Sequence, residues 1–229
     1  MTRLELRRIP QTLALIGLLV LGGCVGARTP TAGNALVNDA TAALRALKKR
    51  QTLKEFRPML KQAAGVAIFP ALYKAGFFIG AEGGNGVLLA RRKDGSWGYP
   101  AFYTMGTGSF GLQIGAQISE VVLIIRSPGA LKAILRHQGK LGADAGIAVA
   151  WTGAGVEGGV TSNLNFDVVA FSNNMGLYGG ASLEGAAMVR RNDMNAQYYG
   201  AGATPEKIIL ENRLSNAQAD GLRAELAAE

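Results

Sequence analysis

The chain holds one cysteine, Cys24, and one histidine, His137. A disulfide needs two thiols, and a zinc site usually needs several Cys or His ligands, so neither is available. His137 closes a predicted helix over residues 128–138, just before Gly139, where a protonated imidazole interacts favourably with the helix dipole. We therefore interpret His137 as a helix-terminal residue, and we expect no metal site and no catalytic base.

Two glycine patterns match the fingerprint of dinucleotide-binding loops, at residues 106–111 and 153–158. That fingerprint binds phosphate only where a helix opens at its end, whereas here an alternating and then continuous apolar pattern, typical of strands, follows the first match. We expect no nucleotide cofactor.

Other catalytic arrangements are equally weak. Ser109 lacks the G-x-S-x-G elbow of hydrolases, and one histidine is too few for most triads. Four glutamates could in principle pair as acid and base, but we interpret them as surface or turn carboxylates: Glu82, Glu120, Glu157 and Glu184. The prediction is a non-enzymatic protein without catalytic residues or cofactors.

The first 23 residues have the layout of an export signal. Three arginines (Arg3, Arg7 and Arg8) precede an apolar run over residues 12–21, and Gly22 and Gly23 follow it. The run of about ten residues is too short to span a bilayer, which needs roughly 20. We expect residues 1–23 to be removed as a signal peptide.

The tetrapeptide Leu21-Gly22-Gly23-Cys24 resembles the lipobox of bacterial lipoproteins. The resemblance implies that Cys24 becomes the first residue of the mature chain and carries a diacylglyceryl group and an acyl chain. Two or three such chains give durable membrane anchoring. Val25 stands where lipoproteins of the inner membrane usually carry Asp, so the resemblance favours the outer membrane and its periplasmic face. The alternative is a small buried cysteine after an ordinary signal.

Charge restricts the partners that the mature chain would attract. The full chain has a formal net charge of +8, and cleavage before Cys24 removes three Arg and one Glu. The remaining domain is still basic, which in the cell envelope favours anionic lipid, lipopolysaccharide or acidic polymer over nucleic acid.

Periodicity predicts the organisation of the remaining chain. Residues 24–34 form a tether of about 35 Å at most, and residues 35–229 form a single domain. Within it we expect a basic helical region over 35–64, a β-rich core over 65–190 and C-terminal helices over 191–229. Helical spacing of apolar residues predicts a first helix from residue 35 to about 55, and Pro58 at a first helical position begins a second one that ends before Gly65.

The β-rich core has short segments separated by turn residues. Asp94-Gly95 predicts a type I′ hairpin turn, Asn173-Asn174 another turn, and residues 121–126 (VVLIIR) a strand covered on both faces. Thirty-two glycines in the chain indicate bends and bulges. The expected fold is α+β, with a strongly curved, largely antiparallel, glycine-rich sheet or partly closed barrel, N-terminal helices, one internal helix and C-terminal helices. A pure β-sandwich is the alternative.

Basic residues crowd the end of the predicted first helix. The candidates for binding lipid headgroups are Arg45, Lys48, Lys49, Arg50 and Lys54. Each cation near an anionic leaflet contributes about 1 kcal/mol of attraction, so this region could add a second membrane contact to Cys24. The alternative is an ordinary amphipathic helix whose cations are solvated.

An ordered set of segments resembles the SYLF domain family. These segments are residues 65–70 (GVAIFP), 74–80 (KAGFFIG), 86–90 (GVLLA), 95–97 (GSW), 111–116 (GLQIGA) and 182–185 (SLEG), with Tyr198-Tyr199-Gly200 near the end. The resemblance implies a lipid-binding, non-enzymatic module, in which eukaryotic members bind phosphoinositides through a basic N-terminal region and yeast members also bind actin. Here that region corresponds to residues 35–61, with Lys74, Arg91 and Arg92 as weaker candidates on the strands.

Only part of what the resemblance implies is expected of this chain. It has no SH3 or FYVE module, and a bacterial envelope offers neither actin nor abundant phosphoinositide. We therefore expect recognition of an anionic headgroup, such as phosphatidylglycerol, cardiolipin or a lipid A phosphate, without actin binding. The alternative is a structural lipoprotein that uses its curled sheet to hold a protein or glycan partner.

Overall fold

The computed structural model describes residues 31–76, 79–110, 115–137, 149–153, 167–172 and 186–228, and residues 31–229 group as one compact unit. The predicted signal peptide, Cys24, most of the tether, the Asn173-Asn174 turn, Glu157 and Glu184 lie outside the described residues. Among the described helices, none is both long and apolar enough to cross a membrane.

The described strands form one seven-stranded sheet in the order β5-β6-β4-β1-β2-β3-β7. The strands are β1 (Gly65–Gly76), β2 (Ile79–Ala90), β3 (Ala101–Phe110), β4 (Gly115–Ile125), β5 (Val149–Gly153), β6 (Val168–Ser172) and β7 (Ala187–Arg190). All neighbours pair antiparallel except β5 and β6, which pair parallel. The predicted α+β class and largely antiparallel sheet are confirmed, and the sheet stays open instead of closing into a barrel.

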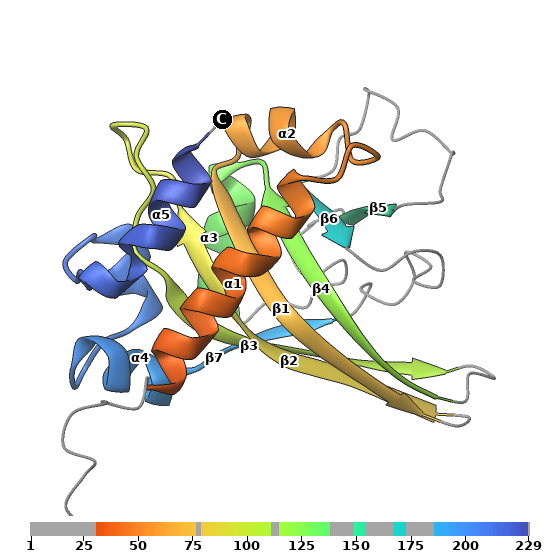
Figure 1. Ribbon diagram of the computed structural model, residues 1–229. Coiled ribbons are helices and arrows are strands. Elements are labelled where there is room, and N and C mark those ends of the chain that lie inside the picture. Colours follow the sequence, from red (N-terminus) through yellow and green to blue (C-terminus); the bar gives the residue numbers. More distant parts are fainter. Residues whose placement is uncertain are drawn as a thin grey trace, which may run out of the picture. The chain divides into compact units, whose positions relative to one another are not determined.

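Helices cover both faces of this sheet (Figure 1). They are α1 (Ala32–Lys48), α2 (Phe56–Gln62), α3 (Pro128–His137), α4 (Asn192–Tyr199) and α5 (Asp220–Ala227), with a π-helical turn at Glu206–Leu210 and a 3-10 turn at Ala217–Ala219. One apolar cluster joins the sheet to α1, α2, α4 and α5, and a second joins its other face to α3. The order of N-terminal, internal and C-terminal helices is as predicted.

Strand β4 shows why an unbroken apolar run signals two-sided burial. Val122 and Ile124 pack in the cluster beneath α1, whereas Val121, Leu123 and Ile125 pack in the cluster beneath α3. All five are fully buried. Each contributes about 1.5–3 kcal/mol of transfer free energy to folding, so packing of helices on both sides of the central strands stabilises the domain.

The first helix ends at Lys48, seven residues earlier than the predicted end near 55. Its apolar stripe continues to Leu44 and Leu47, but the next positions of the same stripe are polar. Ending the helix there lets the chain turn and bury Leu53 and Phe56 instead. The second helix correspondingly begins at Phe56, which places Pro58 third in the helix, still within the first turn, where no backbone N–H is required.

The turn at Asp94-Gly95 exists but is not type I′. Gly95 has a φ of +84°, whereas Asp94 does not share this left-handed conformation. The Asp94 carboxylate accepts hydrogen bonds from the Ser96 N–H (2.9 Å) and hydroxyl (2.7 Å), which holds a three-residue loop with a single left-handed glycine. Beyond it, residues 96–100 contribute only an isolated bridge, Arg91 to Trp97, whereas a hairpin turn would continue directly into a second strand.

Glycines on β2 admit a bulge in β1. Pairing of β1 shifts register between Ile68 and Tyr73 along β2. A Cβ on Gly84 would stand 2.1 Å from the Ala71 carbonyl oxygen, and one on Gly86 would stand 2.4 Å from the Phe69 ring. Only glycine therefore allows β2 to follow the bulge closely.

Candidate anion-binding site

Three helices end at one corner of the domain, and a cation from a different segment caps each of them. The last carbonyl groups of a helix have no partner within it. α1 ends at Lys48, α2 at Gln62 and α5 at Ala227, and residues next to all three ends line a common pocket.

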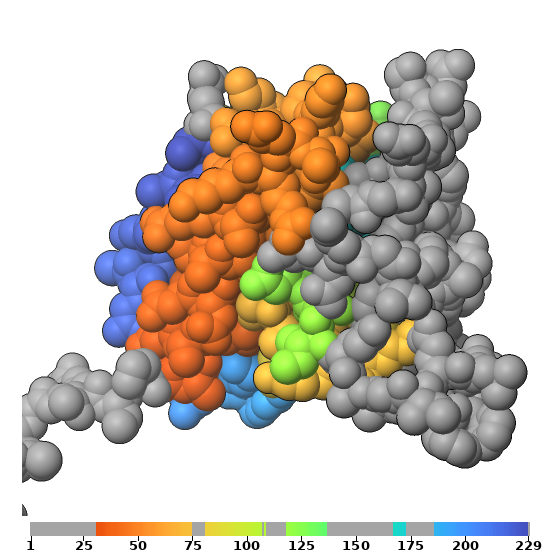
Figure 2. All heavy atoms as spheres, turned by 45° about the vertical axis from the view of Figure 1, so that its right-hand side comes forward, coloured from red at the N-terminus to blue at the C-terminus, as the bar shows by residue number. Residues whose placement is uncertain are grey.

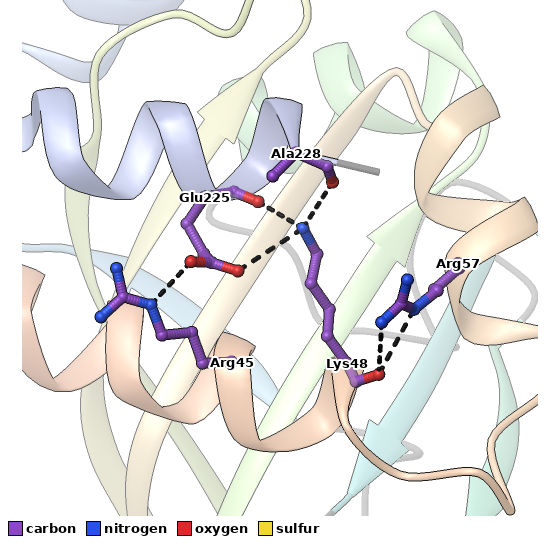
Figure 3. Close-up of polar contacts among 5 residues, drawn as sticks. All are labelled: Arg45, Lys48, Arg57, Glu225 and Ala228. Atoms are coloured by element: carbon purple, nitrogen blue, oxygen red, sulfur yellow. Dashed lines mark hydrogen bonds and ion pairs between the residues drawn. The ribbon is translucent and has the colours of Figure 1, made fainter.

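Lys48 caps α5. Its ammonium donates to the carbonyl oxygens of Glu225 and Ala228, the latter at 2.8 Å, and lies 3.7 Å from the Glu225 carboxylate (Figure 3). Only 7% of the Lys48 side chain is exposed. Burial lowers the pKa of Lys48, an effect that the neighbouring Glu225 carboxylate partly offsets. Lys48 thus joins the first and last helices of the domain.

Arginines cap the other two helices. Arg57 donates from Nε and Nη2 to the Lys48 carbonyl at 3.3 and 3.0 Å. Arg91 donates from Nη2 to the Leu60 carbonyl (3.0 Å) and from Nε to the Ala63 carbonyl (3.1 Å), with its guanidinium 4.4 Å from the Trp97 ring centroid. Burial lowers the pKa of Arg91. Each fork-shaped guanidinium therefore binds carbonyl oxygens at a helix end.

The pocket between these caps has a volume of about 310 Å³. Four cations line it together with apolar side chains: Lys48, Arg57, Lys61 and Arg91, with Leu60, Leu226, Ala227 and Ala228. No carboxylate side chain is among these described lining residues. The corner is therefore suited to an anion, and we call it the corner pocket.

The predicted headgroup candidates fall into two groups. Arg45 donates from Nε to Glu225 Oε2 at 2.6 Å, so Arg45 and Lys48 share one carboxylate. Lys49 and Lys54 are exposed and Arg50 is half-buried, at the end of α1 and in the segment before α2. These three, which we call the rim cations, make no side-chain hydrogen bond or ion pair with another described residue.

The weaker candidates are not brought together. Lys74 is half-buried near the far end of β1, about 30 Å along the strand from the corner, and stands beside Glu82 in the pairing of β1 with β2. Arg91 lies in the corner pocket. Arg92 donates to Asn212 Oδ1 at 2.9 Å and lies over the Tyr99 ring.

The glutamates do not form a metal site: among the described residues there is no group of three Asp, Glu, His or Cys side chains that could hold a metal ion. The interpretation of Glu82 as a surface or turn carboxylate is wrong, because it lies within β2 and is only 5% exposed. Glu120 is half-buried on β4.

Sequence reasoning did not select Arg57, Lys61 or Glu225 for the site. One signal was available, since α5 has no basic residue in its last turn and its terminal carbonyls therefore need a donor from elsewhere. Nothing in the local sequence identifies that donor as Lys48, which lies 177 residues before Glu225.

A family model and individual proteins of known sequence identify the same group of relatives. The family model described as "Las17-binding protein actin regulator", Ysc84, matches residues 106–229, more than half of the chain. The chain is 32% identical over 159 residues to LAS seventeen-binding protein 3 of Saccharomyces cerevisiae, covering 68% of this chain and 34% of that protein. It is 30% identical over 165 residues to human SH3 domain-containing YSC84-like protein 1, covering 72% of this chain and 48% of that protein. The chain thus spans half or less of the length of these relatives.

Proposed function

Because the chain belongs to the Ysc84 family, also called SYLF, we propose that it is a non-enzymatic binding protein that recognises anionic phospholipid headgroups at a membrane surface. The observation that carries the proposal is the set of rim cations, Lys49, Arg50 and Lys54. They project from the end of α1 and the following segment, next to a pocket lined by four more cations. Each cation close to an anionic leaflet contributes about 1 kcal/mol, so three give a useful but reversible contact.

Membrane attachment has a second proposed component. The lipobox resemblance makes Cys24 the lipid-bearing residue of an envelope lipoprotein, held on the periplasmic face of the outer membrane. Because α1 begins at Ala32, three residues earlier than predicted, the tether would shorten to residues 24–31 and keep the domain within about 27 Å of the bilayer. The lipid on Cys24 would hold the domain at the membrane surface, where its cations would bind anionic headgroups at a high effective concentration.

Actin regulation is not part of the proposal. The family is described by that activity and one yeast relative is named for binding LAS seventeen, but the chain covers only part of those proteins. The headgroup we propose is a phospholipid or lipid A phosphate of the bacterial envelope, in the place of the phosphoinositides that the resemblance implies for eukaryotic members.

One observation favours a protein or glycan partner as the second candidate function. Tyr73 and Ile118 pair across β1 and β4 and are 59% and 57% exposed. They stand on the same side of the sheet as α1, where part of β4, coloured green, reaches the surface beside that helix (Figure 2). Such an apolar pair suits a partner that is not a headgroup.

Co-sedimentation with vesicles tests the proposed function. Residues 25–229 contain the whole compact unit and lack Cys24, so any binding comes from the domain. We expect binding that rises with the fraction of phosphatidylglycerol in phosphatidylcholine vesicles and falls from 50 to 300 mM salt, because screening shortens the reach of exposed charges. Binding that ignores both variables would overturn the proposal in favour of the second candidate.

Glu225→Gln should strengthen vesicle binding by about twofold to fivefold. The carboxylate lies 2.6 Å from Arg45 and neutralises one cation at the basic corner. Glutamine keeps the length and can still accept a hydrogen bond, and one added unit of positive charge is worth up to about 1 kcal/mol near the leaflet.

The matched control is Asp220→Asn, which removes one carboxylate from the opposite end of the same helix, where Asp220 pairs with Arg223. It should change vesicle affinity by less than about twofold, because the helix separates it by about 10 Å from the corner at Ala227, more than a Debye length of ~8 Å. Equal gains from both variants would show that only net charge matters.

A further inference from the structure

The two arginines of the corner pocket have N–H donors that helix capping does not use. A guanidinium carries five N–H donors. The hydrogen bonds to carbonyl oxygens described above use two donors of Arg57 and, with one from Arg91 Nη1 to the Gly95 carbonyl (3.0 Å), three donors of Arg91. Neither hydrogen bond of Arg57 comes from Nη1. Donors therefore remain beside a cavity of about 310 Å³.

We propose that the corner pocket binds a single phosphate monoester group, with Arg57 as its main bidentate donor and Lys48 and Arg91 as supporting charges. This inference rests on the proposed function and names the chemical class of headgroup. The group belongs either to a lipid, such as phosphatidic acid, or to a soluble phosphate, and its two negative charges distinguish it from the phosphodiester of phosphatidylglycerol.

Pre-organisation is the reason why this pocket suits a compact dianion. The carbonyl oxygens at the helix ends hold Lys48 and Arg91 in place, so little side-chain freedom is lost when an anion arrives. Leu60 and Leu226 form an apolar part of the wall, and hydrogen bonds to charged groups are stronger beside such a surface than in open water. The rim cations, by contrast, are not held by other described side chains and suit any anionic surface.

Charge accounting supports the same ligand. Lys48, Arg57 and Arg91 line the pocket, and the carboxylate of Glu225, which contacts Lys48 without lining it, is shared with Arg45. The terminal carbonyls of each helix carry roughly half a negative charge. Among the described residues, the corner consequently keeps a positive excess, which a phosphate dianion would offset.

The test uses residues 25–229 and two probes. Inorganic phosphate, titrated while amide NMR shifts are followed, reports the soluble source. Vesicles containing phosphatidic acid or phosphatidylglycerol, matched in total charge, report the lipid source. We expect millimolar or tighter phosphate binding with shifts centred on residues 57–61 and 91, and tighter binding to phosphatidic acid than to charge-matched phosphatidylglycerol.

Arg57→Gln should weaken phosphate binding by roughly tenfold, and Arg57→Lys by roughly threefold, because lysine keeps the charge but loses the fork. The control is Lys54→Gln, which removes a rim cation outside the pocket and should change phosphate binding by less than about twofold. Arg57 is exposed, so these variants should stay folded.

Two outcomes would overturn the inference: no phosphate shifts at the pocket, or equal losses in the Arg57 and Lys54 variants. Vesicle binding that depends on charge but does not distinguish the two lipids would exclude a lipid phosphate as the ligand of the pocket while leaving the proposed function intact. Absence of binding to either anionic vesicle would instead refute the proposed function, and phosphate shifts alone would then identify a soluble ligand.

Discussion

Reversing the charge of all three rim cations, Lys49→Glu, Arg50→Glu and Lys54→Glu together, should reduce vesicle binding by roughly a hundredfold or more. Three cations contribute about 3 kcal/mol near an anionic leaflet, and each tenfold change in affinity corresponds to about 1.4 kcal/mol. Glutamate adds repulsion to this loss. None of the three side chains makes a polar contact with another described residue, so the fold should tolerate the change.

The control variant reverses the same amount of charge on the other face of the sheet. Lys132 and Arg136 lie on α3, and Lys207 lies on the π-helical turn packed in the same cluster; all three are exposed. Their reversal should reduce co-sedimentation with phosphatidylglycerol vesicles by less than about fivefold, through net charge alone. Equal losses in the two triple variants would contradict a located binding surface.

Lys48→Met should lower the free energy of unfolding by about 2 kcal/mol. Methionine keeps the apolar stem but leaves the part-buried carbonyl groups of Glu225 and Ala228 without their donor, and the loss of each hydrogen bond costs about 1 kcal/mol. Part of that loss is recovered, because burial opposes the charged ammonium, as its lowered pKa indicates. Urea denaturation followed by tryptophan fluorescence measures the change.

Lys49→Met is the matched control for stability. Lys49 is the next residue and is exposed, and substitutions of that kind usually stay within about 0.5 kcal/mol. Both variants remove one cation from the basic corner, so each should weaken vesicle binding by up to about fivefold, and only Lys48→Met should lower the free energy of unfolding. An equal stability loss in both would refute the capping role of Lys48.

Local patterns predicted much of the fold because local forces decide it. The apolar stripe of α1, the unbroken run of β4 and the helix at Pro128–His137 each follow from spacing within about ten residues. The predictions of the end of the first helix and of the turn type at Asp94-Gly95 were wrong because other interactions outweighed the local pattern. Burial of Leu53 and Phe56 ended the helix, and a side-chain hydrogen bond to Ser96 kept Asp94 out of the left-handed region.

The site was predictable only in part, for a related reason. The density of basic residues along the chain identified the end of α1 and the segment that follows it, including Lys49, Arg50 and Lys54. Charge density does not tell a cation that faces solvent from one that caps a helix, because the cap of Lys48 is completed by α5, 177 residues later. The same distance in sequence hides the pairing of Arg45 with Glu225 and the burial of Glu82 between neighbouring strands.

In the proposed orientation, the domain meets the membrane through its rim cations. Amide NMR of residues 25–229 on phosphatidylglycerol nanodiscs that contain a lipid with a paramagnetic headgroup reports this orientation residue by residue. We predict the strongest line broadening at residues 49–54, weaker broadening at residues 57–61, and little at α3 or at Tyr73 and Ile118. Broadening centred on Tyr73 and Ile118 would contradict this orientation and assign the membrane contact to the exposed face of the sheet.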